Sequence, residues 1–305
     1  MSLPTFAVIG AARSGTTALT EALRRHPDAF VTSPKEPHYF AFAGQELAFR
    51  GPGDAEGINA AAVTDTDDYL ALYAGSDSCT ARGEGSVSTL YYHREATGAI
   101  TALNPAMRLV VVLRDPVDRA FSSFQYQRMR GREPEADFGK ALALEEERRA
   151  AGWHHLWHYS AMSRYADALA TFTQAFGAEQ ICVLVYDDLT TDSSAALRQM
   201  YEHLGLDPGR AAAAGAPRVN SSGSARSRRT QLALNRMGGS PRLKRAGRRV
   251  MPYAVRERVR QWNQAEATVP AAAREALAPR FADDLGRVED ILGRRLPAWG
   301  RTGRT

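Results

Sequence analysis

The sequence predicts an α/β fold, with a central parallel β-sheet flanked by helices on both faces and a helical C-terminal part. Short, mostly uninterrupted apolar runs are typical of buried parallel strands. Amphipathic stretches lie between these runs, as the crossover connections of a parallel sheet require. A turn with two glycines follows the first apolar run, which predicts a P-loop-like sheet whose carboxyl edge binds an anion.

Five strands and seven helices are expected in alternating order. The strands are predicted at residues 6–10, 29–32, 80–85, 108–113 and 180–186. The helices are predicted at residues 15–26, 66–74, 95–103, 116–130, 135–150, 160–176 and 189–204. The last hundred residues, including 276–293, are expected to form helices and loops that pack back on the sheet.

Composition indicates one globular domain over residues 1–305. Hydrophobic residues make up 44% of the chain and charged residues 24%, and no long linker interrupts it. The sequence has no apolar run of about eighteen residues and no basic leader before its first strand, so we expect a cytoplasmic protein without stable membrane insertion. Cys79 and Cys182 lie far apart in the sequence, which predicts neither a disulfide framework nor a metal site.

The net charge of +5 is unevenly distributed along the chain. No acidic residue occurs between Asp207 and Glu257. The basic residues that accumulate there include Arg218, Arg226, Arg228, Arg229, Arg236, Arg242, Lys244, Arg245, Arg248 and Arg249. Such a block attracts nucleic acid, anionic lipid or an anionic small ligand, or else forms a solvated basic face.

The first glycine turn has the spacing of a phosphate-binding loop. Gly10 and Gly15 are separated by four residues between a strand and a helix, so backbone amides and the helix N-terminus could bind an anion. In P-loop nucleoside triphosphatases a lysine follows the second glycine, whereas Thr16 and Thr17 follow it here. The side chains that could join the amides are those of Arg13, Ser14, Thr16 and Thr17. A tight turn without a ligand is the structural alternative.

A second strand-to-helix segment, residues 108–124, points to the same edge of the sheet. Arg114 lies where the strand ends, and Ser122 follows about two helical turns later, so both side chains could reach one anion. Asp115 and Pro116 are typical of an N-cap and a first helical residue. Because Arg114 precedes Asp115, no acid has the placement that binds magnesium in nucleotide triphosphatases.

These segments resemble sulfotransferases that use 3′-phosphoadenosine 5′-phosphosulfate (PAPS). IGAARSGTTAL at 9–19 resembles their 5′-phosphosulfate loop, and VLRDPVDRAFSSF at 112–124 resembles their 3′-phosphate segment. Further similar motifs occur in the same order along nearly the whole chain. They are KEPHYF at 35–40, GEGSVSTLYY at 83–92, SRYADAL at 163–169, VYDDL at 185–189, VNSSGSARSRR at 219–229 and LGRRLPAW at 292–299.

The resemblance implies a donor site for PAPS, with 3′-phosphoadenosine 5′-phosphate (PAP) as product and no metal. Arg13 and the loop would stabilise charge on the leaving phosphate. Many relatives have lysine at the position of Arg13, and arginine keeps the charge but donates a proton less readily. Arg114 and Ser122 would bind the 3′-phosphate, and a late loop would close over it. The residues of that loop are Asn220, Ser222, Gly223 and Arg226.

The resemblance also implies a catalytic base in the segment Lys35-Glu36-Pro37-His38. Glutamate is the base in the similar segment of glycosaminoglycan-type sulfotransferases, so we predict Glu36 as base. Lys35 would polarise the sulfuryl oxygens, and His38 would orient or assist. His38 is the alternative base, because cytosolic small-molecule sulfotransferases use histidine. A charged loop without a catalytic role is the structural alternative.

Two further segments carry polar side chains. Glu84, Ser86 and Ser88 follow the third strand and are expected to line the same cleft, although the serines could instead form a turn that caps the next helix. His154 and His158 would share a helix face if the segment 153–159 were helical. That segment could hold a metal, form an aromatic wall for an acceptor or pack in the core.

Three functions fit the sequence. A PAPS-dependent sulfotransferase, acting on a hydroxyl of a small-molecule, glycopeptide, glycolipid or carbohydrate acceptor and not on nucleic acid, explains the ordered motifs. An ATP-dependent P-loop kinase is opposed by Thr16 in place of lysine. A non-enzymatic polyanion-binding protein would explain only the basic block. The acceptor and the oligomeric state are not predicted.

Overall fold

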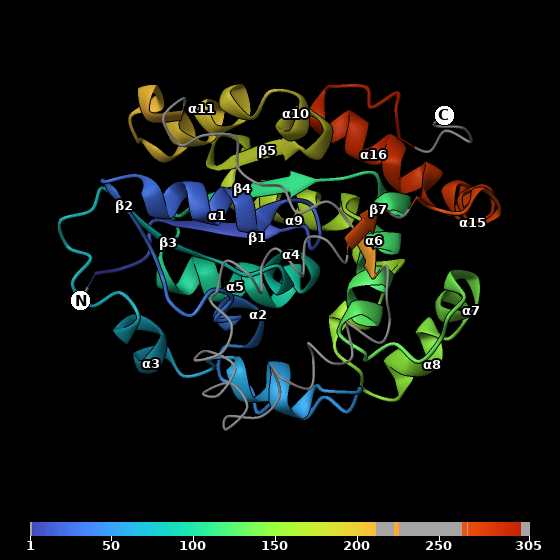
Figure 1. Cartoon of the computed structure of the whole chain (residues 1–305). Coiled ribbons are helices and arrows are strands. Elements are labelled where there is room, and N and C mark those ends of the chain that lie inside the picture. Colours follow the sequence, from blue (N-terminus) through green and yellow to red (C-terminus); the bar gives the residue numbers. More distant parts are fainter. Residues whose placement is uncertain (1, 212–222, 226–263, 267, 300–305) are drawn as a thin grey trace, which may run out of the picture.

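A five-stranded parallel sheet crosses the middle of the molecule, with the strand order β2-β3-β1-β4-β5 (Figure 1). This computed structural model describes residues 2–211, 223–225, 264–266 and 268–299. The strands are β1 (Phe6–Gly10), β2 (Ala29–Val31), β3 (Ala81–Gly85), β4 (Arg108–Leu113) and β5 (Ile181–Val185). All five lie at the predicted places, so the α/β prediction is confirmed.

Helices connect the strands and cover both faces of the sheet (Figure 1). The α-helices are α1 (Thr16–Arg25), α2 (Tyr39–Phe42), α3 (Thr66–Ala71), α4 (Ser88–Tyr91), α5 (His93–Leu103), α6 (Pro116–Met129), α7 (Phe138–Ala143), α8 (Glu145–Ala150), α9 (Ala166–Phe176), α10 (Tyr186–Thr191), α11 (Ser193–Leu204), α15 (Ala271–Leu277) and α16 (Ala282–Leu292). Short π or 3-10 segments occur at η1 (Ala55–Asn59), η2 (His155–Trp157), η3 (Ala161–Ser163), η4 (Ala178–Gln180), η5 (Pro208–Ala211) and η6 (Ala278–Phe281). Among the described helices, none is both long and apolar enough to cross a membrane.

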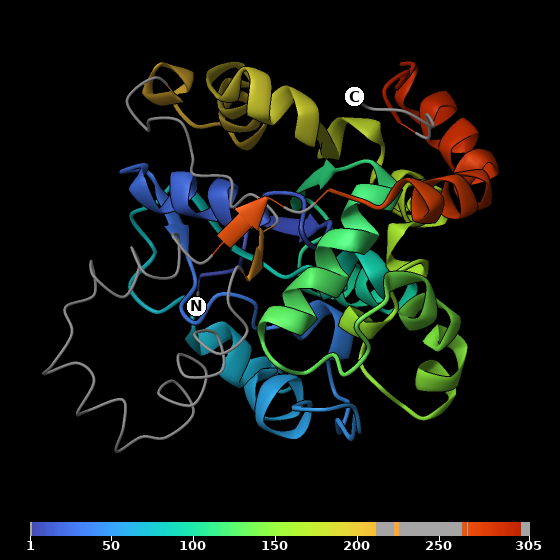
Figure 2. The same cartoon turned by 45° about the vertical axis from the view of Figure 1, so that its right-hand side comes forward.

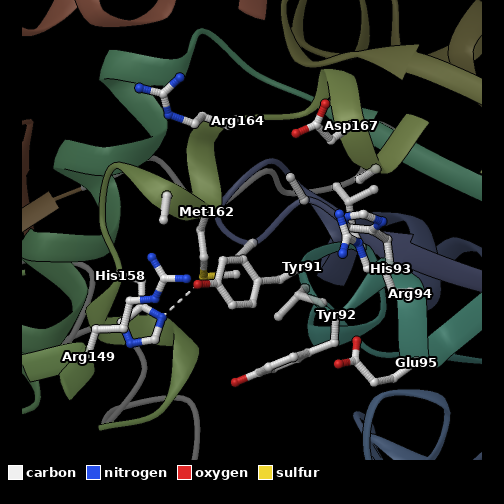
Figure 3. Close-up of a pocket in the computed structure, with 16 residues that line it drawn as sticks. Tyr91, Tyr92, His93, Arg94, Glu95, Arg149, His158, Met162, Arg164 and Asp167 are labelled. Carbon is white, nitrogen blue, oxygen red and sulfur yellow. Dashed lines mark hydrogen bonds between the residues drawn. The ribbon is translucent and has the colours of Figure 1, made fainter. Parts of the chain in front are cut away.

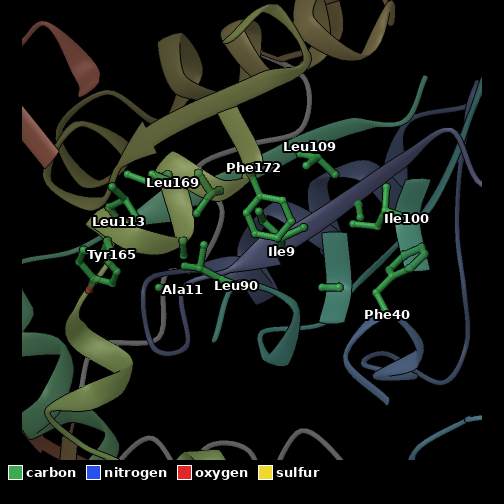
Figure 4. Packing of buried hydrophobic residues seen from close by; sticks show 14 of the residues in the cluster. Ile9, Ala11, Phe40, Leu90, Ile100, Leu109, Leu113, Tyr165, Leu169 and Phe172 are labelled. Carbon is green, nitrogen blue, oxygen red and sulfur yellow. The ribbon is translucent and has the colours of Figure 1, made fainter. Parts of the chain in front are cut away.

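Alternation along the strands divides the core into two layers. In β1, Phe6 and Val8 pack with α1 and α11 on one face, whereas Ala7 and Ile9 pack with α5 and α9 on the other. Figure 4 shows the second layer, where Phe172 of α9 lies close to the β1 side chains. Burial on both faces explains why the strands are uninterrupted apolar runs.

Three predicted helices are each broken in two. The expected helix 189–204 divides at Asp192, whose side chain accepts the Ala195 amide proton and so caps α11. The expected helix 135–150 divides at Leu144, between α7 and α8. In the expected helix 160–176, the amide of Tyr165 donates to Asp284 of α16, 2.9 Å away, before α9 begins. At the first and third of these breaks, a side-chain cap and a long-range contact override the continuous helical pattern.

Helix α15 and the η6 turn pack against α6 and hold its N-terminus in place (Figure 2), whereas α16 packs against α9. Arg274 of α15 is buried and forms ion pairs with Asp115 and Asp118 in the first turn of α6. A two-stranded antiparallel ribbon, β6 (Gly223–Ala225) and β7 (Gln264–Glu266), also lies beside α6 (Figure 2). This ribbon was not predicted, because helices and loops were expected throughout the last hundred residues.

Candidate active site

The loop between β1 and α1 presents unpaired donor groups at the carboxyl edge of the sheet. Gly15 caps α1 with a φ of 98° and offers no side chain, and the first turn of α1 contains no acidic residue. The first amides of a helix have no partners within the helix, and the helix dipole makes this end positive. The hydroxyl of Ser14 is buried without a hydrogen-bond partner. The residues present therefore fit an anion held by the loop.

Arg13 connects this loop to α6. Its Nε donates to Ser122 Oγ over 3.2 Å, and its guanidinium carbon lies 4.7 Å from the centre of the Tyr126 ring. Burial lowers the pKa of Arg13, and the nearby Arg114 lowers it further, while Tyr126 opposes the shift. Arginine nevertheless remains charged at neutral pH. The two segments that the sequence predicted to bind separate phosphates therefore meet at one place.

Arg114 is fixed by contacts from three parts of the chain. Its Nη1 donates to the carbonyl oxygen of Arg13 over 3.0 Å, and its guanidinium carbon lies 4.4 Å from the centre of the Tyr186 ring. Tyr165 donates its hydroxyl proton to the Arg114 carbonyl over 3.0 Å. Asp115 caps α6 through the amides of residues 117 and 118, as its sequence context predicted. Tyr165, which belongs to the SRYADAL motif, thus orients the predicted 3′-phosphate segment.

The segment Lys35–His38 forms a turn in which two residues are left-handed. The φ angles of Glu36 and His38 are 62° and 60°. Lys35 Nζ lies 2.7 Å from Glu36 Oε1, and His38 Nε2 lies 3.8 Å from Glu36 Oε2. Burial lowers the pKa of His38, with Glu36 opposing and Lys35 reinforcing the shift, so the imidazole is neutral at pH 7. The Glu36 side chain is 27% exposed and that of His38 is 11% exposed, which makes the carboxylate the more accessible group.

Glu84, Ser86 and Ser88 do not line an open cleft, so that prediction was wrong. All three are fully buried, because β3 is an interior strand and its end is covered by the Lys35–His38 turn. Ser86 donates to Glu84 Oε2 over 2.6 Å and accepts the His38 amide proton over 2.9 Å. The Ser88 hydroxyl lies 2.8 Å from His38 Nδ1.

Burial raises the pKa of Glu84 from 4.5 to about 8, an effect that the Ser86 hydrogen bond partly opposes. Glu36 raises the pKa further and Lys35 lowers it, and Tyr69 and Tyr73 are the other titratable groups facing this carboxyl. The unfolded chain releases the proton at a lower pH than the folded protein does. Stability therefore falls as pH rises from about 4.5 to about 8, by on the order of a few kcal/mol.

We expect Glu84→Gln to remove this part of the pH dependence. Urea unfolding of both proteins at pH 5 and pH 8 measures it. The free energy of unfolding of Glu84→Gln, relative to that of the wild type, should increase between these pH values. An unchanged difference would show that the Glu84 carboxyl ionises normally.

The segment 153–159 is not an α-helix, so His154 and His158 do not form a metal-binding pair on one helix face. Asp54 is fully buried and lies 3.2 Å from His154 Nε2. His158 Nδ1 lies 2.8 Å from the Tyr91 hydroxyl and its Nε2 lies 3.1 Å from the Trp153 carbonyl. Burial lowers the pKa of His154 to about 3 and that of His158 to about 4.

His158 and Tyr91 line a cavity of about 460 Å³ (Figure 3). The cavity reaches the anion loop at Ala11 and Ala12, and arginines and aromatic rings surround it. Its lining includes neither Arg13 nor Glu36. Lys35 and His38, the other residues predicted to act in catalysis, do not line it either.

The late-loop prediction falls mostly outside the described residues. Asn220, Ser222 and Arg226 are not described, nor are the arginines and the lysine at 228–249. Gly223 begins β6, which lies beside α6, the helix that carries Ser122. The backbone of β6 thus contacts the helix of the predicted 3′-phosphate segment.

Two residues of this region were missed in the sequence. Tyr126 follows Ser122 by one helical turn, a spacing that places both on one face of α6. That spacing was the signal that could have identified it. Tyr186 belongs to the VYDDL motif, but nothing local to its sequence indicates that it packs against Arg114.

Comparisons with known proteins agree with the motifs. The sulfotransferase family model matches residues 4–208. Heparan sulfate glucosamine 3-O-sulfotransferase 3B1 of Mus musculus is 28% identical over 208 residues, covering 67% of this chain and 46% of that protein. Carbohydrate sulfotransferase 15 of Rattus norvegicus is 24% identical over 249 residues, covering 68% of this chain and 44% of that protein. The chain thus spans about half the length of these relatives.

A solved structure is similar over the full length of both chains. The crystal structure of a sulfotransferase from Alicyclobacillus acidocaldarius is 28% identical, has a TM-score of 0.76, and is matched over 99% of this chain and 100% of that one. The family match itself includes the anion loop, the Lys35–His38 turn and the segment with Arg114 and Ser122. The chain therefore belongs to the sulfotransferase family, as its motifs predicted.

Proposed function

We propose that this protein transfers the sulfuryl group of PAPS to a hydroxyl of a carbohydrate-bearing or smaller acceptor. The observation that carries the proposal is the contact between Arg13 and Ser122. This contact brings together the two motifs that are predicted to bind phosphate, which supports one site for a nucleotide with both a 5′-phosphosulfate and a 3′-phosphate. An ATP-dependent kinase needs only the first motif and the lysine that the loop lacks.

Each side of the donor site has its own task. Arg13, Ser14, Gly15, Thr16 and Thr17 hold the 5′ end and stabilise the negative charge that develops there. Arg114 and Ser122 hold the 3′-phosphate, and the resemblance to the family implies that Asn220, Ser222, Gly223 and Arg226 also bind it. PAPS supplies an already activated sulfuryl group, so these residues need no metal ion.

Glu36 takes the proton from the acceptor hydroxyl. Its side chain lies within the strained Lys35–His38 turn, close to Lys35 and exposed enough to be reached. Lys35 stabilises the transferring group, and the neutral His38 orients the Glu36 carboxylate. These residues position the reactants and stabilise charge. Because the sulfuryl group of PAPS is already activated, the reaction needs no further activation of the donor.

An acceptor with negative charge is favoured by the arginines beyond Arg13. Arg130 lies over the same Tyr126 ring, with its guanidinium carbon 5.0 Å from the ring centre. Arg132 packs against Gly53, where a Cβ would come within 2.7 Å of the guanidinium Nε. The relatives named as carbohydrate and heparan sulfate sulfotransferases support a saccharide. Release of PAP from PAPS should therefore be faster with heparosan oligosaccharides than with neutral chitin oligosaccharides or water.

Calorimetry tests the donor directly. We expect the protein to bind PAP more tightly than ADP or ATP in the absence of magnesium. Arg114→Ala should weaken PAP binding by about ten- to a hundredfold, because charge-assisted hydrogen bonds are lost. Arg198→Ala on the exposed face of α11 is the matched control and should bind normally. ATP binding as tight as PAP binding, or no effect of Arg114→Ala, would contradict the proposed PAPS site. Either result would favour the alternative that the protein is an ATP-dependent kinase.

A further inference from the structure

The Lys35–His38 turn needs support from outside its own sequence. Glu36 and His38 both have positive φ angles, 62° and 60°, which residues with a Cβ rarely adopt. Neither is a glycine, so their left-handed conformation persists only if neighbouring groups hold it. The amide of His38 is the backbone group through which such support can act.

Ser86 provides that support from the end of β3. Its hydroxyl oxygen accepts the His38 amide proton over 2.9 Å. A serine hydroxyl has a single proton, and here it is donated to Glu84 Oε2 over 2.6 Å. Glu84 therefore fixes the rotation of the hydroxyl so that its lone pair faces His38.

Ser88 holds the other part of the same histidine. Its hydroxyl lies 2.8 Å from His38 Nδ1, while His38 Nε2 lies 3.8 Å from Glu36 Oε2. The backbone of His38 is thus tied to Ser86 and its ring to Ser88. Both ties come from the segment that begins at Glu84, so the position of Glu36 depends on that segment.

Glu84 is an unusual residue to find in this place. It is completely buried, its Oε1 has no hydrogen-bond partner, and none of the described cations forms an ion pair with it. Even the neutral carboxyl, which burial favours, leaves Oε1 without a partner, so an apolar side chain would suit the core better. What the carboxyl does provide is an acceptor for the Ser86 hydroxyl.

We propose that Glu84, acting through Ser86, is a positioning residue that holds the Glu36–His38 turn in its left-handed conformation. This inference rests on the proposed role of Glu36 as base. Glu84 touches neither donor nor acceptor, and its effect passes through two hydrogen bonds to the backbone of His38.

Hydrogen–deuterium exchange of the peptide spanning residues 35–40 tests the first step without any acceptor. In PAP-bound Ser86→Ala, the His38 amide loses its partner and should exchange roughly tenfold faster or more. Glu84→Leu should have the same effect, whereas Glu84→Gln keeps an acceptor for Ser86 and should exchange nearly as the wild type. Thr89→Val is the matched control, because Thr89 is a buried hydroxyl of the same segment with no hydrogen-bond partner. Unchanged exchange in Ser86→Ala would overturn the proposal, and it does so even if Glu84→Leu fails to fold.

Measuring both PAP affinity and the rate of PAP release from PAPS distinguishes a displaced Glu36 from a general loss of structure, which would weaken PAP binding as well. Ser86→Ala should bind PAP as the wild type does and release PAP about tenfold more slowly at saturating PAPS, with heparosan oligosaccharide or water as acceptor. Glu84→Gln should restore most of that rate. If Ser86→Ala and Glu84→Leu keep the full rate while Glu36→Gln is inactive, the proposed positioning role of Glu84 is wrong. The assignment of Glu36 as base is then still supported. If Glu36→Gln is also fully active, the proposed base is wrong, and faster exchange in Ser86→Ala would still show support of the turn.

Discussion

Glu36→Gln should lower the rate of PAP release from PAPS by about 10²- to 10⁴-fold, the usual contribution of a positioned general base. Glutamine keeps the size of the side chain and its contact with Lys35, but it cannot accept the acceptor proton. PAP affinity should stay the same, because the residues proposed to bind PAP include Arg13 and Arg114 and do not include Glu36. The measurement is PAP formation at saturating PAPS with heparosan oligosaccharides, chitin oligosaccharides and water as acceptors, beside calorimetry with PAP.

Glu202→Gln on the exposed side of α11 is the control for loss of one negative charge, and it should be fully active. Full activity of Glu36→Gln would contradict its assignment as base. His38→Gln then decides the alternative, since a base role for His38 predicts a loss of similar size. If His38 only orients Glu36, the loss in His38→Gln should be smaller than in Glu36→Gln.

Arg13→Ala should lower turnover by about 10²- to 10³-fold, the effect of removing one preorganised donor from a developing negative charge. It also removes the contact with Ser122 and the cation over Tyr126, so PAP binding should weaken as well. Arg13→Lys should recover much of the turnover, because it restores the charge. It should recover less of the PAP affinity, because an ammonium group lacks the planar guanidinium that reaches Ser122.

Arg128→Ala provides the comparison for Arg13→Ala. Arg128 is exposed at the end of α6 and lies over Phe124, away from the anion loop. Steady-state rates of PAP release and PAP affinities are measured for Arg13→Ala, Arg13→Lys and Arg128→Ala. We expect only the two Arg13 variants to differ from the wild type. An Arg13→Ala protein with unchanged turnover would mean that the loop amides alone stabilise the leaving phosphate.

The sequence predicts those parts of the fold that local patterns specify. The runs that became β1 and β4 are buried on both faces, and that burial is visible as uninterrupted apolar sequence. The break between α10 and α11 was missed, although aspartate is a residue type that favours helix N-caps and Asp192 was the local signal for it. The contact of Tyr165 with Asp284 joins residues 119 positions apart, which no local pattern can predict.

The candidate site divides in the same way. The anion loop and the Arg114 segment could be predicted because glycine spacing and N-cap chemistry are local. Burial of Glu84 could not, because a glutamate at the end of a strand usually faces solvent or ligand. Its burial depends on the interior position of β3 and on the packing of the Lys35–His38 turn over the end of that strand.

The ion pairs of Arg274 with Asp115 and Asp118 affect the order in which the protein can mature during translation. The Arg274 and Asp115 positions are separated by 159 residues. At about 5 to 20 residues added per second, on the order of ten to thirty seconds of synthesis lie between them. Through that interval Asp115 and Asp118 lack the positive charge of Arg274, so their carboxylates repel a nucleotide phosphate more strongly than in the finished protein. Affinity for the donor should therefore arise late, when the chain emerging from the ribosome includes α15.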